Sequence, residues 1–395
     1  MKIALVSPYD FSVPGGVNSH IAHLAENFVD LGHQVRIVAP ASRPRETAPG
    51  VIVVGRPIGV PAGGSVARIA LSLRLAPQVK RVLADEEFDV VHIHEPFTPF
   101  LPVQFLRYSD AINVATFHAA RERGSSRWYA YGRRVLRRGF RRLDGKIAVS
   151  LPAMRLVSRY FPGYFNIIPN GVDVAHFSAP VGPLPQYCDG KLNVLFVGRP
   201  EPRKGLAFLL RAFVRVKAEV PNARLLVVGA GNFDRYRRSM EQAGVPDIDF
   251  VGWVTYEDLA RYHRAAHVFC APATGYESQG IVLLEAMAAG TPIVASNVEG
   301  YASVLTHSVE GLLVLPKETG ALAEALIQLL KDEETRKAMG ERGRLRAQEY
   351  SWERISQRVL SYYERLLHER QLMLREADER AGLPPSPATV EPAAS

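Results

Sequence analysis

The sequence predicts an α/β protein built from two doubly wound domains, each a parallel sheet with helices on both faces. Three observations indicate this class. The chain has 395 residues, which exceeds the roughly 100 to 200 residues of a typical single domain. Short apolar, β-rich runs alternate with helical patterns in both halves, as in parallel sheets with crossover helices. A proline-rich stretch separates the two halves.

The first half of the chain consists mainly of short apolar runs. An amphipathic helix is predicted over 17–31, between the first two of them. The predicted strands span 3–6, 34–39, 90–94, 113–117 and 146–149.

The second half repeats this design. Its predicted strands span 193–197, 224–228, 249–251, 267–270 and 292–295, and its predicted helices span 205–219, 233–243, 255–265 and 280–289. Two such domains that face one another place the carboxyl ends of both sheets around a shared cleft, where open α/β sheets bind ligands. We therefore expect the active site between the domains.

The domain boundaries follow from composition. Turn and proline signals predict an N-terminal domain over 1–170, a linker over 171–190 and a C-terminal domain over 191–350. A three- and four-residue repeat predicts an amphipathic helix over 351–374, and its apolar stripe consists of Trp352, Ile355, Val359, Tyr362 and Leu366. This stripe fits either the second domain or a return to the first. Residues 384–395 have the composition of a disordered tail.

The formal net charge of +8 is concentrated in one segment. Residues 121–142 contain nine arginines and one acid, so the rest of the chain is neutral. At about 100° per residue, one half of the predicted helix carries Arg133, Arg134, Arg137, Arg138, Arg141 and Arg142. The other half carries Val135, Leu136, Phe140 and Leu143, and Trp128, Tyr129 and Tyr131 come just before.

This cationic amphipathic helix favours binding to an anionic membrane surface. The first alternative is a solvated face whose apolar side packs on the first domain. The second is an arginine-rich nucleic-acid-binding protein. We expect no nucleic acid, because the remaining chain is neutral and no DNA- or RNA-binding motif accompanies the helix.

Cysteine usage and hydropathy indicate the compartment. Cys188 and Cys270 have neither a metal-ligand nor a redox spacing, which fits a reducing environment. The N-terminus has too few apolar residues for a signal-peptide core, and no apolar run approaches the roughly 18 residues of a spanning helix. We expect a cytoplasmic protein that is at most peripheral at the inner face of the membrane.

Two glycine turns carry different predictions. Gly15 and Gly16 follow the first strand and open a helix, where backbone N–H groups suit a phosphate, although a tight structural turn explains them equally well. The turn at 229–231 lacks the third glycine and the ribose-binding acid of a dinucleotide fingerprint. We interpret it as structural, which disfavours an NAD-dependent oxidoreductase.

Charged residues in the second half carry the strongest signals. Arg199 and Lys204 lie between a strand and a helix, where they could neutralise a diphosphate leaving group or form a solvated loop. Glu277 and Glu285 flank Gly280, which starts an apolar helix. Burying a carboxylate there is costly without hydrogen-bond donors, so sugar or ribose hydroxyls are its preferred partners and a structural salt bridge is the alternative.

These motifs resemble those of a known family. The Glu-x7-Glu segment with its Glu-Ala-Met-Ala-Ala-Gly-Thr-Pro continuation, and the Gly-Arg…Lys-Gly loop, are similar to retaining glycosyltransferases of family 4. These enzymes have the GT-B fold of two Rossmann-like domains. In the first half, the motifs at 8–9, 13–20, 64–68, 92–96 and 115–118 resemble phosphatidylinositol mannosyltransferases of that family. The resemblance covers about residues 1 to 367.

The resemblance implies roles on the donor side of the cleft. Gly16 would offer its N–H to the donor diphosphate, which Arg199 and Lys204 would hold as the leaving group. Glu277 would contact the donor hexose, and Glu285 the ribose. The remaining implied donor-binding residues are Val254, Gly280 and Ile281.

The resemblance also implies the acceptor side and the chemistry. His118 would lie near the transferred sugar and act catalytically with Arg199, Lys204 and Glu277. The acceptor would be lined by Tyr9, Asn18, Ser65 and Arg68, of which Arg68 suits a lipid phosphate. Such enzymes retain the anomeric configuration, usually by front-face attack assisted by the leaving phosphate. We therefore expect no cofactor and no essential metal, and we assign no general base.

Three positions depart from the family pattern. Gln279 stands where the family usually has Phe, next to the nucleotide. Asn18 stands in place of Gln, and Gly64 in place of Asn, at the inositol end of the acceptor site.

The predicted function is transfer of a hexose, best matched by mannose from GDP-mannose, to a membrane phospholipid such as phosphatidylinositol. The alternative within the family is a UDP-sugar with another lipid or a soluble acceptor. The expected partners are therefore a nucleotide-sugar, a phospholipid or glycolipid acceptor and an anionic membrane surface.

Overall fold

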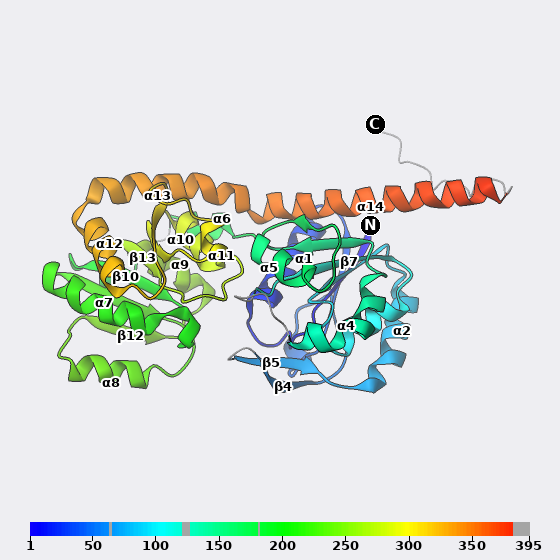
Figure 1. Cartoon of the computed structure of the whole chain (residues 1–395), viewed down its shortest axis with the longest axis horizontal. Coiled ribbons are helices and arrows are strands. Elements are labelled where there is room, and N and C mark those ends of the chain that lie inside the picture. The colour runs from blue at the N-terminus through cyan, green and yellow to red at the C-terminus, as the bar shows by residue number, and fades with distance from the viewer. Residues whose placement is uncertain (63–64, 121–126, 181, 382–395) are drawn as a thin grey trace.

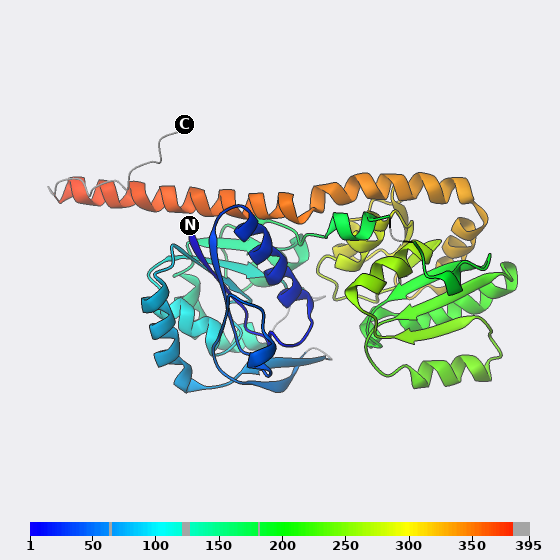
Figure 2. The same ribbon diagram turned by 180° about the vertical axis from the view of Figure 1, so that it is seen from behind.

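The protein is described by a computed structural model that covers residues 1–62, 65–120, 127–180 and 182–381. Two α/β lobes lie side by side, and one long helix runs along both of them (Figure 1). The view from behind shows the same arrangement (Figure 2). The predicted α/β class with two doubly wound sheets is confirmed.

The N-terminal lobe is built on a seven-stranded parallel sheet with the order β3-β2-β1-β6-β7-β8-β9. Its strands are β1 (Lys2–Val6), β2 (Gln34–Ala39), β3 (Val51–Val53), β6 (Val90–His94), β7 (Ile112–Phe117), β8 (Gly145–Ala148) and β9 (Asn166–Ile167). A separate antiparallel hairpin pairs β4 (Pro57–Ala62) with β5 (Ser65–Ala70). The helices are α1 (Gly16–Asp30), α2 (Ala76–Glu86), α3 (Leu101–Tyr108), α4 (Arg127–Phe140) and α5 (Leu151–Ser158).

The C-terminal lobe has a six-stranded parallel sheet with the order β12-β11-β10-β13-β14-β15. Its strands are β10 (Leu192–Val197), β11 (Ala223–Val228), β12 (Ile248–Gly252), β13 (Val268–Ala271), β14 (Ile293–Ser296) and β15 (Gly311–Val314). Its helices are α6 (Val174–Ser178), α7 (Leu206–Glu219), α8 (Asp234–Gln242), α9 (Tyr256–Ala265), α10 (Ile281–Ala289), α11 (Glu299–Ala302), α12 (Thr319–Lys331) and α13 (Glu333–Ala347). The last helix is α14 (Trp352–Arg380).

The central strands explain why the sequence pattern is so clear. Every residue of β6, β7 and β11 is buried, because helices cover both faces of each sheet. Parallel strands in this position read as nearly continuous apolar runs. Among the described residues, each lobe accordingly has two large apolar clusters, one on each face of its sheet, and the N-terminal lobe has a further small one.

Strand order places the ligand site. The strand order reverses between β1 and β6 in the first sheet and between β10 and β13 in the second, although all strands run parallel. Ligands of open α/β sheets bind at such switch points, outside the carboxyl ends of the strands. The loops after these four strands therefore contain the candidate site.

Two chain segments connect the lobes and lie against each other. Val172 on the first segment donates its N–H to the Tyr350 carbonyl on the second at 2.8 Å. A β-carbon on Gly171 would lie 2.5 Å from the ring of Trp352, so only glycine allows this close approach. These two segments, residues 170–172 and 350–352, are called the first and the second crossing, and together they form the hinge between the lobes.

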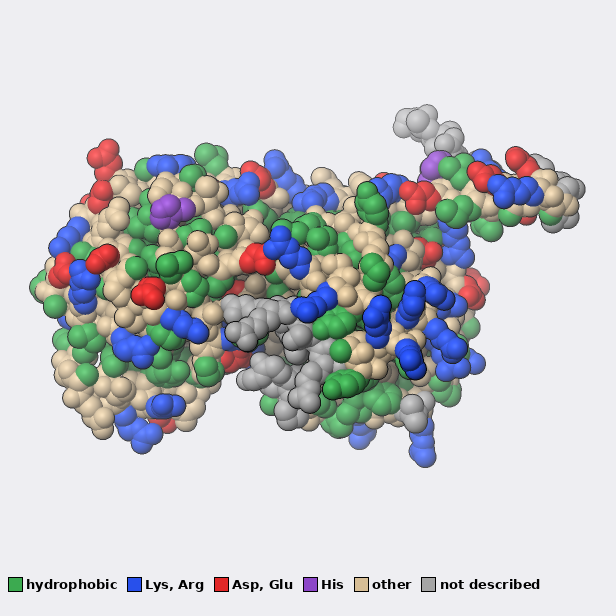
Figure 3. Space-filling model, viewed as in Figure 1, with side chains coloured by type: hydrophobic (Ala, Val, Ile, Leu, Met, Phe, Trp, Pro, Cys, Tyr) green, Lys and Arg blue, Asp and Glu red, His purple; other side chains and the backbone are tan. Residues whose placement is uncertain are grey.

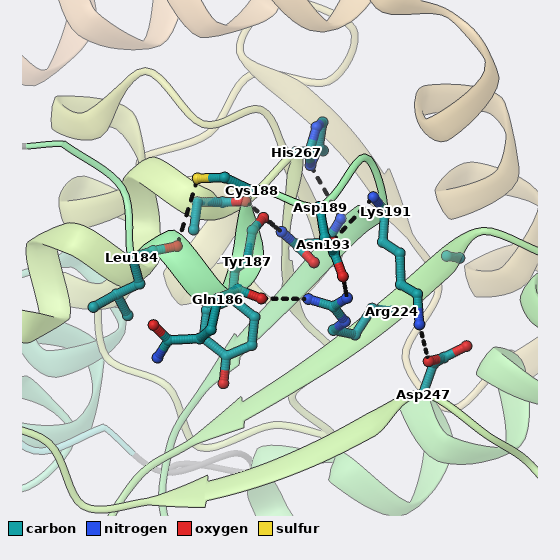
Figure 4. Close-up of polar contacts among 12 residues, drawn as sticks. Leu184, Gln186, Tyr187, Cys188, Asp189, Lys191, Asn193, Arg224, Asp247 and His267 are labelled. Atoms are coloured by element: carbon teal, nitrogen blue, oxygen red, sulfur yellow. Dashed lines mark hydrogen bonds and ion pairs between the residues drawn. The ribbon is translucent and has the colours of Figure 1, made fainter.

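The chain that follows the first crossing is bonded to the C-terminal lobe through residues 186–191 (Figure 4). Arg224 of β11 bonds the carbonyl of Gln186 and pairs with Asp189. Lys191 pairs with Asp247 at 2.5 Å. The end of the predicted linker is therefore ordered by ion pairs, although its proline content resists regular structure.

Helix α14 crosses back to the N-terminal lobe. Ile355, Val359, Tyr363 and Leu366 are buried in the cluster formed by β1 and α1. Of the two placements that the apolar stripe allowed, the return to the first domain is the one observed. The helix ends at Arg380, six residues beyond the predicted 374. The predicted tail over 384–395 lies outside the described residues.

Candidate active site

The cleft contains a pocket of about 360 Å³ that is lined from both lobes. The loop after β1, the first turn of α1 and strand β5 form one wall, and Arg199 comes from the other lobe. Five residues predicted for the site line this pocket: Tyr9, Gly16, Asn18, Arg68 and Arg199. The structure therefore brings donor-side and acceptor-side residues together.

Helix N-termini from both lobes meet in the cleft. A β-carbon on Gly16, the first residue of α1, would lie 4.0 Å from Cδ1 of Ile281, the first residue of α10. Neither helix has a side-chain cap or an acidic residue in its first turn. Their unpaired N–H groups and dipoles favour an anion such as a diphosphate at this place.

Glu277 lies in the loop after β13 and is held by two cations. Its Oε1 is 2.8 Å from Lys204 Nζ and accepts a hydrogen bond from Arg203 Nη1 at 2.6 Å. Arg199 and Arg203 also pair with Glu201, each at 2.8 Å. Of the two cations predicted to hold the leaving group, Lys204 thus contacts the carboxylate predicted to bind the hexose, and Arg199 is linked to it through Glu201 and Arg203.

Gly280 ends this loop in a conformation that other residues rarely adopt. Its φ is +90°, and a β-carbon would lie 2.5 Å from the Tyr301 ring. Glycine is required on both counts. The turn delivers the chain from Glu277 into α10.

Glu285 in α10 is largely enclosed, with 13% of its side chain exposed. Its Oε2 is buried without a hydrogen-bond partner among the described residues, and Nε2 of His263 is 4.0 Å away from it. Burial lowers the pKa of His263 to about 3, so a neutral ring faces Glu285, which disfavours the alternative of a structural salt bridge. Burial raises the pKa of Glu285 to about 7, and the charge of Lys204 opposes this rise. Hydroxyl donors of a ligand would stabilise the ionised form.

His118 follows β7 and belongs to a column of four histidines. Its Nε2 is 3.0 Å from Nδ1 of His94, and its ring meets His20 edge to face with centroids 4.9 Å apart. His92 adjoins His94 and is bonded to the hydroxyl of Tyr363 on α14. Burial lowers the pKa of His118 to about 3, so the ring is neutral and acts by hydrogen bonding.

The acceptor-side residues differ in what they can offer a ligand. Arg68 is exposed at the pocket, as a phosphate-binding residue requires. The Asn18 amide is already engaged: it accepts from Ser7 Oγ at 2.8 Å and donates to the carbonyls of Asp10 and Val13. Asn18 therefore shapes the wall of the pocket. Gly64 and the side chain of Ser65 lie outside the described residues.

Two residues of the site escaped the motif-based prediction. Arg203 shares Glu277 with Lys204, and Glu95 accepts the backbone N–H groups of His118 and Ala119 at 2.7 and 2.8 Å. Glu95 has a left-handed backbone, with φ of 49°, and is buried. Its place directly after a strand, beside the two histidines of the motif at 92–96, was the available signal. Val254 is half-buried beside α9.

The basic helix differs from its prediction at two points. Arg133, Arg134, Arg137 and Arg138 are exposed on α4, as predicted. Val135 was assigned to the packed half, but 75% of its surface is exposed. Arg142 lies beyond the helix and donates to the carbonyls of Leu106 and Ser109, each at 2.7 Å, so it fastens the end of α3. Arg121 and Arg123 lie outside the described residues.

Among the residues that the structure describes, none of the helices combines the length and the apolar character needed to cross a bilayer.

Comparison with known families matches both halves of the chain. Residues 14–176 match the model "Glycosyltransferase Family 4", and residues 188–346 match "Glycosyl transferases group 1". The chain is 40% identical over 368 residues to the phosphatidyl-myo-inositol mannosyltransferase of Mycolicibacterium smegmatis, covering 92% of this chain and 94% of that protein. The corresponding protein of Propionibacterium freudenreichii is 36% identical, with 92% and 94% covered.

Solved structures support the fold. The sucrose-phosphate synthase of Thermosynechococcus elongatus has a TM-score of 0.74 at 24% identity, covering 93% of this chain and 99% of that one. Anabaena HepE in complex with UDP has a TM-score of 0.74 at 19% identity, covering 92% and 100%. The architecture, the cleft and the sequence identity over nearly the whole length agree: the chain belongs to family 4 of the glycosyltransferases and is an enzyme with the GT-B fold.

Proposed function

We propose that this enzyme transfers an α-mannosyl unit from GDP-mannose to phosphatidylinositol at the cytoplasmic face of the membrane. The observation that carries the proposal is the 40% identity to a phosphatidyl-myo-inositol mannosyltransferase across 92% of the chain. The cleft supports it, because donor-side and acceptor-side residues share one pocket.

The donor diphosphate fits between the N-termini of α1 and α10. There Gly16 lines the pocket, and Arg199 and Lys204 supply the positive charge that a departing nucleoside diphosphate requires. Glu277 then binds hydroxyls of the hexose. Glu285 has a carboxylate oxygen without a protein partner, which ribose hydroxyls would satisfy.

The proposed chemistry is the one that the resemblance to the family implies. The acceptor hydroxyl attacks on the face from which the diphosphate leaves, and the leaving phosphate takes the proton, so the anomeric configuration is retained. His118 is neutral and lies beside the sugar as a hydrogen-bond partner. Arg199, Lys204 and the helix N-termini offset the charge of the leaving group, so no metal is assigned to this step.

The acceptor approaches along the wall formed by Tyr9 and Arg68. Arg68 binds the lipid phosphate, while the acyl chains stay in the membrane. The exposed arginines of α4 dock the N-terminal lobe on anionic lipid, at about 1 kcal/mol for each basic residue near the surface. Lys and Arg side chains gather on that lobe around α4 (Figure 3), and Trp128, Tyr131 and Val135 are exposed beside them.

Labelled donors test this proposal directly. Purified protein and a membrane lipid extract are incubated in parallel with labelled GDP-mannose, UDP-glucose and UDP-N-acetylglucosamine, and the lipid phase is counted. We expect only the mannose label to enter the lipid. Entry of a UDP-sugar label instead would support the alternative donor, and absence of any label from the lipid would contradict a lipid acceptor.

A further inference from the structure

The loop that contains Glu277 touches the opposite lobe through its next two residues. Ser278 Oγ lies 2.9 Å from Ser150 Oγ, just after β8. Gln279 and Asn170 are joined by three hydrogen bonds: Gln279 Oε1 accepts the N–H and the Nδ2 of Asn170, both at 2.7 Å, and Gln279 Nε2 donates to the Asn170 carbonyl at 3.2 Å. The donor loop is therefore bonded to the first crossing between the lobes.

The amide pair of Gln279 and Asn170 is buried. Gln279 is 2% exposed and Asn170 6%. The family usually has Phe at position 279, and a phenyl ring could make none of the three bonds. Since buried amides need partners, each residue of the pair fixes the conformation of the other.

Gln279 also determines how Asn170 is turned. The Nδ2 of Asn170 donates to Gln279, which leaves its Oδ1 for other donors. Hydrogen bonding to the Asn170 side chain opposes the lowering of the pKa of His20 and of His118 by burial, as expected where this oxygen faces the two rings. An amide oxygen accepts only from an imidazole N–H, so a bond to it selects one tautomer of a neutral ring. His94 Nδ1 lies 3.0 Å from Nε2 of the same ring.

The hinge holds Asn170 in this position. The next residue, Gly171, packs on Trp352, and Val172 is bonded to Tyr350 of the second crossing. The Trp352 ring in turn meets His20 with centroids 5.1 Å apart. A change in the donor loop that moves Gln279 must therefore move Asn170 relative to the histidines, or break the three bonds.

We propose that Gln279 is a positioning residue, which links the donor loop to His118 through Asn170 and so sets the orientation and tautomer of that ring. The inference rests on the proposed function in one respect, that His118 lies beside the transferred sugar. Gln279 then acts on the transfer step and does not hold the nucleotide.

Two variants and a control distinguish an effect of the Gln279–Asn170 pair on transfer from a general loss of stability. Gln279→Met removes the three hydrogen bonds at similar volume, and Gln279→Glu keeps an accepting oxygen for Asn170. Gln328→Met is the matched control, since Gln328 is exposed on α12. Each protein is assayed for mannosyl transfer, for GDP affinity by calorimetry and for the His118 tautomer by nitrogen-15 NMR of labelled histidine.

We expect kcat to fall about tenfold or more in Gln279→Met, with the donor KM and the GDP affinity changed less than about twofold. The kcat of Gln279→Glu should lie between the values of Gln279→Met and wild type. The His118 nitrogen signals should change from one tautomer to a mixture in Gln279→Met, and the control should match wild type in every measurement.

Unchanged kcat and unchanged His118 signals in Gln279→Met would overturn the inference. If that variant does not fold, the same comparison is made with Gln279→Glu, in which a wild-type kcat together with wild-type signals overturns it. Wild-type protein that transfers no mannose would instead contradict the proposed function. The NMR measurement still tests the amide pair in that case, because it needs no turnover.

Discussion

Single residues in the cleft show how the charges of the donor site are kept in place before a ligand binds. Glu277, Arg203 and Lys204 neutralise one another within 2.8 Å, although they come from loops after different strands. The sequence predicted Glu277 and Lys204 from their motifs. It could not predict Arg203, because one more arginine in a basic loop carries no signal until the fold places it against a carboxylate.

Glu277→Ala should abolish transfer, with a loss in kcat of at least about 100-fold, because the hexose loses its charged contact and two cations lose their partner. The fold should persist, since Glu277 lies in a loop. Transfer assays and thermal unfolding check both points. Glu324→Ala is the control, because Glu324 pairs with Arg215 on the surface. Wild-type turnover in Glu277→Ala would sink the site assignment.

Glu285 should make the protein less stable as the pH rises. The folded pKa of about 7 lies above the ordinary value of 4.5, so the folded state binds the proton more tightly than the unfolded state. The stability that the protonated carboxyl contributes to the folded state is fully present below about pH 4.5 and is lost as the pH rises through about 7.

Glu285→Gln should therefore gain stability relative to wild type between pH 5 and pH 8, on the order of 3 kcal/mol, while it binds GDP more weakly. Urea unfolding at both pH values measures the stability, and calorimetry measures the GDP affinity. An equal stability difference at the two pH values would contradict the assigned burial.

The interior strands of both sheets were predicted, whereas among the described edge strands β12 alone was predicted, over 249–251. Strands β1, β6 and β11 are mostly apolar and buried. The edge strands β3 and β9 escaped prediction, because β3 is half-buried and β9 has two residues, one of them exposed. Helix α14 was predicted, but its apolar stripe could not indicate which lobe it covers. Contacts such as Tyr363 with His92 decide that, and they join residues far apart in the chain.

Helix α4 should determine membrane binding through four arginines. Replacing Arg133, Arg134, Arg137 and Arg138 with Gln should reduce co-sedimentation with phosphatidylinositol-containing vesicles, most strongly at low salt. The charge-matched control replaces four exposed arginines of the other lobe: Arg211, Arg235, Arg238 and Arg342. Equal sedimentation of the two variants and wild type would reject the membrane role. Arg142→Gln should act differently, by destabilising the end of α3.

At the scale of the whole molecule, two switch points and one hinge create the site. The alternation of strands and helices predicted both sheets and placed the site between them. The hinge was not predicted, because it depends on the contact of Gly171 with Trp352 and on the pairing of Gln279 with Asn170. The regular alternation of strands and helices in a doubly wound domain carries no information on how two domains meet.

Metal chelation tests whether protein groups of the cleft alone stabilise the charge of the leaving group. Because cationic side chains and helix N-termini surround the diphosphate site, EDTA should change the rate of transfer by less than about twofold. The rate is measured with and without added magnesium. Complete loss in EDTA that magnesium restores would contradict a metal-independent transfer.

The proposed reaction is mannosyl transfer to phosphatidylinositol with retention of configuration. The most direct measurement incubates purified protein with vesicles of defined phosphatidylinositol and labelled GDP-mannose, or in parallel a labelled UDP-sugar, and treats the lipid product with α- or β-mannosidase. With GDP-mannose we expect labelled phosphatidylinositol from which α-mannosidase alone releases the label. A product that only β-mannosidase cleaves, or vesicles that GDP-mannose leaves unlabelled and a UDP-sugar labels, would contradict the proposed reaction.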